Sequence, residues 1–153
     1  MTDFKENKLI DFLFRAQALG IGGATAAAGT GPATLYIGLF TAAGSDAAVG
    51  TEVTGGSYAR VAVTSSLANW AGTQSAGSTT VSSGSSGTTS NNNAVTFPAP
   101  TANWGQVVEW GFFDAATGGN ELDRAALTVA KTINSGDAAP SFAAGALTYQ
   151  IDN

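Results

Sequence analysis

The feature that most constrains the fold is a run of alternating side chains followed by a glycine pair, at residues 107–119. Successive side chains of a β-strand point to opposite faces, so the even-numbered residues of this run would share one face. That face carries Val108, Trp110 and Phe112. All three are large and apolar, and we expect the face to be turned inward. Gly118-Gly119 predicts a hairpin, because glycine accepts the positive φ of type I′ and II′ turns. The expected core anchors are Trp104, Trp110 and Phe112.

The same alternation predicts further strands along the chain. They lie at residues 34–41, 58–64, 124–133 and 147–152. Connections rich in Gly, Asn and Ser separate them, as is typical of turns. Short strands behind one leading helix predict a mainly β fold, an antiparallel β-sandwich or jelly-roll-like domain. A small open barrel is the alternative architecture.

Residues 3–19 predict one helix. Asp3 and Glu6 match an acidic form of the capping box, and Gly20 provides a stop. The stretch from Gly20 to Pro32 is mostly Gly, Ala and Thr with little to bury, and we interpret it as a linker. The expected organisation is an N-terminal helical assembly arm at residues 1–20 and a β-sandwich domain at residues 33–153.

The faces of this helix are unequal. Lys8, Asp11 and Arg15 form one narrow polar stripe, in which Asp11 and Arg15 are four residues apart and able to pair. Two interpretations stand: a helix sunk in a groove of its own domain, or a helix that docks on a neighbouring subunit. Under the second, the chain is a homo-oligomer, and we expect a trimer. The expected assembly interface comprises Phe4, Leu9, Ile10, Phe12, Leu13 and Phe14.

Residues 71–93 are almost devoid of side chains that could form a core. All but four of them are Ser, Thr, Gly or Asn. Such a stretch buries too little apolar area to offset its ordering entropy, which predicts a flexible or solvent-laid loop. The alternative is that assembly orders the loop by pairing its hydroxyls and amides with backbone groups.

The sequence lacks most of the side chains that catalytic and metal sites use. The sequence has no His and no Cys, so the usual general base, thiol nucleophile and zinc ligands are missing. Glu109 and Asp114 are the closest carboxylate pair, but alternation points them to opposite faces. Oxygen ligands for calcium occur at Asp114, Thr117, Asn120, Glu121 and Asp123, with a spacing that favours a plain turn. We therefore expect no enzyme, no cofactor and no metal site.

Charge and hydropathy exclude two classes of partner. A net charge of −5 with six basic residues argues against nucleic-acid binding, which needs clustered Lys and Arg. No run approaches the roughly 20 apolar residues that span a bilayer. Only 11% of the residues are charged, and such a surface is easily covered by partners, which favours a protein that lives in an assembly.

An ordered series of motifs supports that expectation. Val95-Thr96-Phe97-Pro98, Gly111-Phe112-Phe113-Asp114 and Leu147-Thr148-Tyr149-Gln150 belong to it, and the pattern extends upstream to about Ala33. The series resembles a family of small structural proteins of tailed bacteriophages, labelled tail-fibre-like or head-decoration proteins. The resemblance implies a non-enzymatic virion protein, assembled in the host cytoplasm and bound to the major capsid protein or other virion proteins.

The position in the virion is the remaining question. The chain lacks the long repeated shaft of a true fibre, which favours a capsid decoration (cement) protein that stabilises the head lattice. The alternative is a tail-associated protein, a fibre base or adaptor, that binds glycans. Its stacking platforms would include Trp70, Trp104 and Trp110.

Overall fold

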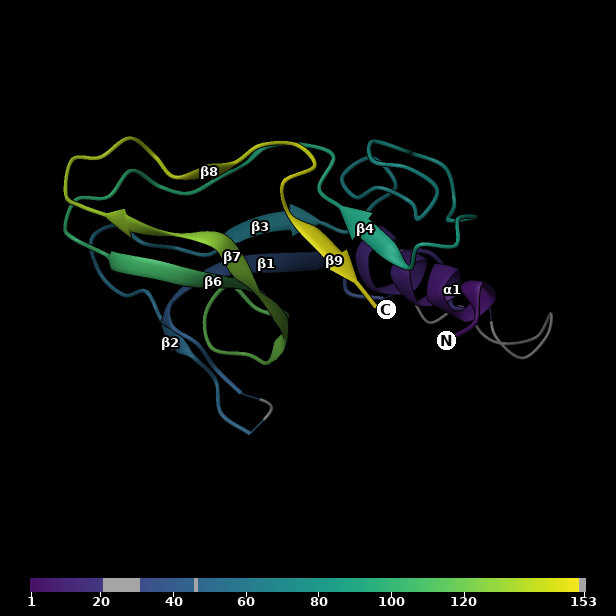
Figure 1. Cartoon of the computed structure of the whole chain (residues 1–153), viewed down its shortest axis with the longest axis horizontal. Helices are drawn as coiled ribbons and strands as arrows, with labels where there is room; N and C mark the ends of the chain where they lie inside the picture. Colours follow the sequence, from purple (N-terminus) through teal and green to yellow (C-terminus); the bar gives the residue numbers. More distant parts are fainter. Residues whose placement is uncertain (21–30, 46, 152–153) are drawn as a thin grey trace. The chain divides into compact units, whose positions relative to one another are not determined.

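The computed structural model describes residues 1–20, 31–45 and 47–151, so most of the predicted linker lies outside the described residues. The chain divides into two compact units, each of which is described by itself. The helix unit comprises Met1–Thr34, Thr64–Val95 and Phe142–Asn153. The sheet unit comprises Leu35–Val63 and Thr96–Ser141. Within the described ranges the fold is mainly β, with antiparallel sheets and one N-terminal helix, which confirms the predicted class (Figure 1).

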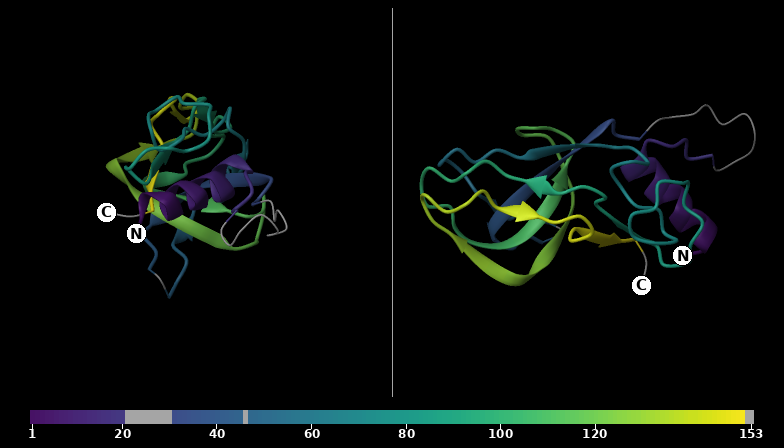
Figure 2. Two further views of the ribbon diagram at one scale, coloured as in Figure 1. Left: turned by 90° about the vertical axis from the view of Figure 1, so that its right-hand side faces the viewer. Right: turned by 90° about the horizontal axis from the view of Figure 1, so that it is seen from above.

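The helix unit holds α1 (Asp3–Arg15) and a short antiparallel pair of β4 (Thr88–Ser90) and β9 (Thr148–Gln150). β9 is the predicted terminal strand in a shorter form, whereas β4 lies in the segment expected to be a loop. Figure 2 shows α1 beside the turns within residues 64–95 of the same unit. The apolar centre is small. Phe14 packs against Trp70 and Tyr149 with ring centroids 5.1 and 5.2 Å apart.

The helix begins at Asp3 as predicted, but the predicted capping box does not form and the predicted end at residue 19 is wrong. Thr2, extended at φ −87° and ψ 145°, is the N-cap, and no side-chain capping bond forms. Its carbonyl accepts from the backbone N–H groups of Lys5 and Glu6, so Asp3 is already helical. At the other end Ala16 adopts φ 54° and the N–H of Gln17 donates to the Asp11 carbonyl. This closure satisfies the last carbonyls before Gly20 is reached.

The sheet unit is built on one antiparallel sheet in the order β2-β1-β6-β7, with β3 also paired to β1. The strands are β1 (Thr34–Ala42), β2 (Thr51–Glu52), β3 (Val61–Thr64), β6 (Gly105–Phe113) and β7 (Glu121–Ile133). β6 and β7 form the predicted hairpin, and β6 pairs on its other side with β1 (Figure 1). A further short pair joins β5 (Val95–Thr96) and β8 (Ser141–Phe142).

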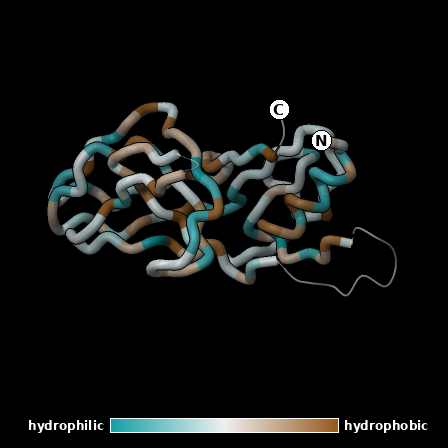
Figure 3. Tube along the Cα trace, turned by 90° about the horizontal axis from the view of Figure 1, so that it is seen from below, coloured by the Kyte–Doolittle hydropathy of each residue, from teal (hydrophilic) through white to brown (hydrophobic). Residues whose placement is uncertain are grey.

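Burial in β6 extends to both of its faces. Trp104, Trp110 and Phe112 lie between 2 and 5% exposed, and Val107 and Phe113 on the opposite face are equally buried. Trp110 meets Phe112 edge to face at 4.8 Å, while Phe113 stacks on Phe40 at 5.8 Å. The expectation of a single inward face is therefore too narrow. Figure 3 shows hydrophobic residues in both units.

Candidate functional site

One network of buried polar contacts holds α1 against the Ser/Thr/Gly-rich segment of its own unit. The Arg15 side chain is fully buried and donates from Nη1 to Asp11 Oδ1 at 2.7 Å and from Nε to the Trp70 carbonyl at 3.0 Å. Asp11 in turn accepts from the backbone N–H and the hydroxyl of Ser82, at 2.9 and 2.6 Å. Further acceptors of the guanidinium are Ser82 Oγ and the carbonyls of Ser78 and Thr80. We call this set the Arg15 network.

This network buries two members of the polar stripe of α1. Asp11 and Arg15 pair as predicted, but the stripe that they form faces inward, because a buried charge is tolerated where an opposite charge and several acceptors surround it. Asn7 extends the contact by donating to the Gly84 carbonyl at 2.9 Å and accepting from the Thr73 hydroxyl. The segment thus wraps the polar side of α1.

The expectation that residues 71–93 bury little is wrong at several positions. Ala71, Thr73, Thr89, Ser90 and Asn91 are each at most 5% exposed. The Asn91 amide accepts from the Leu147 N–H at 2.8 Å and donates to two carbonyls, those of Asn93 and Ala143. Hydroxyls and amides do pair with backbone groups, as the alternative envisaged, but they pair within the chain. Hydrogen bonds here take the place of apolar burial.

The predicted assembly residues of α1 fall into three classes of exposure. Ile10 and Phe14 are buried in the helix unit, at 0 and 3%. Phe4 is 60% exposed, with Lys8 Nζ 5.9 Å from its ring centroid. Leu9, Phe12 and Leu13 are half-buried. The residues still available to a partner are therefore Phe4 and, in part, the three half-buried side chains.

A second arginine organises the sheet unit. Arg60 binds Glu52 in bidentate fashion at 2.8 and 2.7 Å and donates to the carbonyls of Ala115 and Gly118, both at 2.8 Å. Its guanidinium lies 3.3 Å from the ring centroid of Phe113. A planar, permanently charged fork suits both contacts. We call this the Arg60 network.

Tyr58 completes the Arg60 network. Its hydroxyl donates to Glu52 at 2.8 Å and accepts from the Leu39 N–H at 2.9 Å. Burial, assisted by the neighbouring Glu52 carboxylate, raises the pKa of Tyr58 well above its usual range. Its ring packs on Phe97 and edge-on to Trp104. The neutral phenol is thus a fixed bridge between β1 and the charged pair. Sequence reasoning missed this grouping, and the only signal was the charged pair Glu52 and Arg60 beside a long uncharged segment.

The loop of the β6–β7 hairpin is tied by Asp114. Its carboxylate accepts from the backbone N–H and from the side-chain amide of Asn120, both at 2.7 Å. These two bonds lower the pKa of Asp114. Gly118 and Gly119 have φ of 61° and 69°, which confirms the predicted positive φ. The loop is longer than a two-residue turn, however, and a Cβ at Gly119 would collide with the Asp114 carboxylate.

The carboxylates considered for chemistry are thus used in structural contacts. Glu109 accepts from the Gly44 N–H at 3.2 Å and lies 4.0 Å from Arg124 Nε. Asp114 is held by Asn120. Among the described residues, no group of three or more acidic, His or Cys side chains is arranged to hold a metal ion. No helix in the described ranges is long and apolar enough to cross a membrane.

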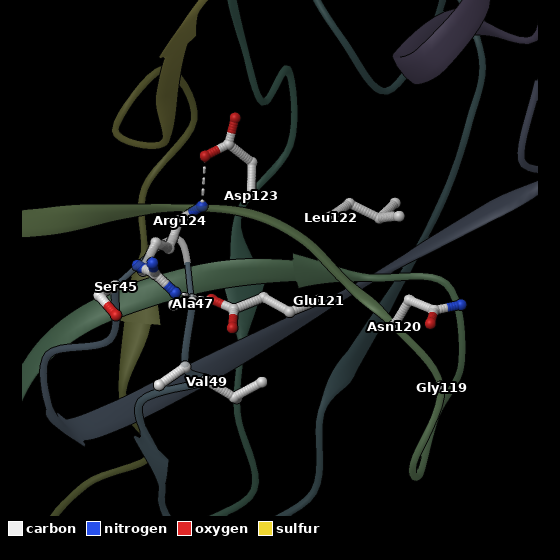
Figure 4. A pocket seen from close by; sticks show the side chains of 10 residues that line it. Ser45, Ala47, Val49, Gly119, Asn120, Glu121, Leu122, Asp123 and Arg124 are labelled. Atoms are coloured by element: carbon white, nitrogen blue, oxygen red, sulfur yellow. Dashed lines mark hydrogen bonds and ion pairs between the residues drawn. The ribbon is translucent and has the colours of Figure 1, made fainter.

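An open hollow of about 560 Å³ lies in the sheet unit, between the 45–49 connection and the start of β7 (Figure 4). Among its lining residues Arg124 donates to Glu121 Oε1 at 3.0 Å, and Val49 and Leu122 are exposed. Its lining contains no aromatic ring on which a sugar could stack. Trp70, Trp104 and Trp110, the expected platforms for a glycan, are themselves buried, at no more than 5% exposure. Among the described residues, the side chains considered for chemistry or glycan binding are therefore engaged in contacts within the fold.

A family model described as "Podophage GP4 fiber I protein gp80" matches residues 1–150, a range that contains the whole sheet unit and all but the last three residues of the helix unit. The comparison with curated proteins gives no match.

Proposed function

Because the chain belongs to the podophage fibre I (gp80) family of virion proteins, we propose that it is a non-enzymatic structural subunit of the tail-fibre apparatus. Membership places it in the virion. The observation that carries the proposal is the extent of the match, which leaves only the last three residues outside it. A fibre base or adaptor, which the sequence offered as the alternative position, becomes the preferred one.

The interior of the protein supports a scaffolding role. Its three arginines are each bound to carboxylates of the same unit: Arg15 to Asp11, Arg60 to Glu52, and Arg124 to Glu121. Charged groups engaged in this way stabilise local structure, which supports a structural role. The partners that fit are other virion proteins, recognised through a surface of low charge.

Capsid decoration now has less support, since it rested on the missing fibre shaft. Binding to the major capsid protein belongs with that weaker possibility. Self-association into a trimer remains a prediction, with Phe4 and the half-buried apolar residues of α1 as its contact.

Copy number per virion tests the position directly. Purified virions are resolved on a gel and the band of this protein is quantified against the major capsid protein. A fibre subunit is expected in a handful to tens of copies. Hundreds of copies, in a fixed ratio to the capsid protein, would overturn the tail assignment in favour of the head lattice.

A further inference from the structure

The connection between β1 and β2 is held in place by contacts within the sheet unit. The N–H of Gly44 donates to the Glu109 carboxylate at 3.2 Å. A Cβ at Gly44 would collide with the Arg124 guanidinium, so the connection passes directly against that side chain. Further along, Ser45 and Ala48 exchange two backbone hydrogen bonds, at 2.8 and 3.1 Å. This connection forms one side of the open hollow in the sheet unit (Figure 4).

The loop of the β6–β7 hairpin, which continues into the other side of the hollow, is held in the same way. Arg60 donates to the carbonyls of Ala115 and Gly118, and Asp114 accepts from the backbone and the side chain of Asn120. A loop that is already ordered loses little conformational entropy when a partner binds, which favours affinity. Both sides of the hollow are therefore formed in the free chain.

Apolar and acidic side chains are exposed together around this hollow. Among the described residues of the sheet unit, three large apolar side chains are exposed, and two of them, Val49 and Leu122, line the hollow at 65 and 44% exposure. Asp123 lines it too and is exposed. Asp114 in the adjacent loop is exposed as well, and the Asn120 donors that lower its pKa keep it ionised at neutral pH. The surface thus combines apolar area with carboxylates.

The charge of the sheet unit is one-sided. Its sequence holds seven of the eleven acidic residues and three of the six basic ones. Arg60 and Arg124 are bound to Glu52 and Glu121, at 2.7 and 3.0 Å, so their charges are compensated inside the unit. The third cation, Lys131, does not line the hollow. A partner that covers this surface must therefore bring positive charge, whereas the sheet unit of a second copy would bring the same negative excess.

We propose that this hollow is the docking site for an extended segment of another virion protein, in which an arginine or lysine is flanked by an apolar side chain. The apolar side chain covers Val49 and Leu122, and the cation pairs with Asp123. A volume of about 560 Å³ lies within the range of roughly 300–1,000 Å³ that is usual for binding sites. That the partner is a virion protein rests on the proposed function, whereas its chemistry follows from the sheet unit alone.

Short peptides test the chemistry of the site. The probe is the peptide Gly-Leu-Arg-Leu-Gly with both ends blocked, added to the isotope-labelled full chain at low salt and followed by amide chemical shifts in NMR spectra. Saturable shifts are expected at Val49, Leu122 and Asp123. The same peptide with Glu in place of Arg should bind about fivefold more weakly, because its charge is reversed. Added salt should weaken the arginine peptide and narrow this difference.

Matched substitutions locate the site. Asp123→Asn and Leu122→Ser should each weaken binding of the arginine peptide about threefold. The control for the first is Asp137→Asn, the same loss of charge in a turn outside the hollow. The control for the second is Val129→Ser, at an exposed apolar side chain that does not line the hollow. Both controls should bind like wild type.

Three results would overturn the proposal: no saturable shifts in the wild-type chain, equal binding of the two peptides, or equal weakening by the control substitutions. The comparison of the two peptides uses the wild-type chain, so it decides the matter even if a variant fails to fold. Copy number per virion is measured independently, and a failed titration therefore leaves the tail assignment as it stands.

Discussion

The two units of this chain use a buried arginine in different ways. In the sheet unit Arg60 reinforces a framework of β1, β6 and β7 that is already bound by strand pairing and by rings such as Trp110 and Phe112. In the helix unit the apolar centre is small, and Arg15 ties α1 to the carbonyls and hydroxyls of the segment that surrounds it. Where a chain supplies few apolar side chains, a fully hydrogen-bonded ion pair can fix its path.

The largest expected loss of stability comes from a substitution in the core of the sheet unit. Trp110→Ala removes a side chain that is 4% exposed and packed against Phe112, and should destabilise the protein by about 3–5 kcal/mol through the lost burial and the cavity. Chemical denaturation measures it. A midpoint close to that of wild type would mean that this ring is not part of the core.

The matching change in the helix unit is Arg15→Met. It leaves the buried Asp11 without its cation, which should cost about 3 kcal/mol. The control is the double variant Asp11→Leu with Arg15→Met, which removes both charges and should recover a substantial part of the loss. If the double variant is no more stable than the single one, the cost does not arise from the unpaired carboxylate.

A conservative substitution of Arg60 tests how much the sheet unit depends on its arginine, for comparison with Arg15 in the helix unit. Arg60→Lys keeps the charge but loses the bidentate contact to Glu52 and the planar stacking on Phe113, with an expected cost of roughly 1–3 kcal/mol. Thermal unfolding with far-ultraviolet circular dichroism should show the sheet still folded. Loss of the whole fold would instead mean that the sheet unit cannot form without these contacts of Arg60.

Much of the sheet unit was predictable because strand alternation is a local signal. The alternation around Leu35, Ile37 and Leu39 and the Gly118-Gly119 pair led to β1 and the β6–β7 hairpin with small errors at the ends. The contact between Glu52 and Arg60 was not predictable, since it depends on how β2 and the residues before β3 are placed. The positive φ of Ala16, which ends α1 early, also had no signal in an alanine.

The helix unit escaped prediction for a different reason. By the rule for amphipathic helices a charged stripe faces solvent. The residues next to Arg15 in the sequence do not indicate whether its guanidinium is bound by carbonyl groups or by water. The composition of residues 71–93 predicts low apolar burial, but it does not count the hydroxyl and amide groups that satisfy one another. The strand β4 has the sequence Thr-Thr-Ser, in which alternation is invisible.

The smallest expected effects lie at the surface. Phe4→Ser, at a side chain 60% exposed, should change the free energy of unfolding by no more than about 0.5 kcal/mol. If α1 supplies the trimer contact, the same variant should reduce trimer formation in sedimentation experiments. A trimer unaffected by Phe4→Ser would remove this residue from the predicted interface.

The hairpin loop adds a dependence on pH. The folded pKa of Asp114 is depressed by the Asn120 donors, so its contribution to stability is present above the unfolded pKa and is lost as pH falls through the folded pKa. Asn120→Ala should move the Asp114 pKa back towards its ordinary value in an NMR titration. An unchanged titration would show that the side-chain amide is not the cause.

Hydrogen exchange at the Ser82 amide in the isolated full-length chain tests the central contrast most directly. This N–H donates to Asp11 Oδ2 inside the Arg15 network, in a segment whose composition predicts a loose loop. We expect the amide to be protected well beyond unstructured rates in the wild-type protein and to lose that protection in Arg15→Met, while amides of β6 such as that of Trp110 keep theirs. Exchange of the wild-type Ser82 amide at the rate of an unfolded chain would contradict the account.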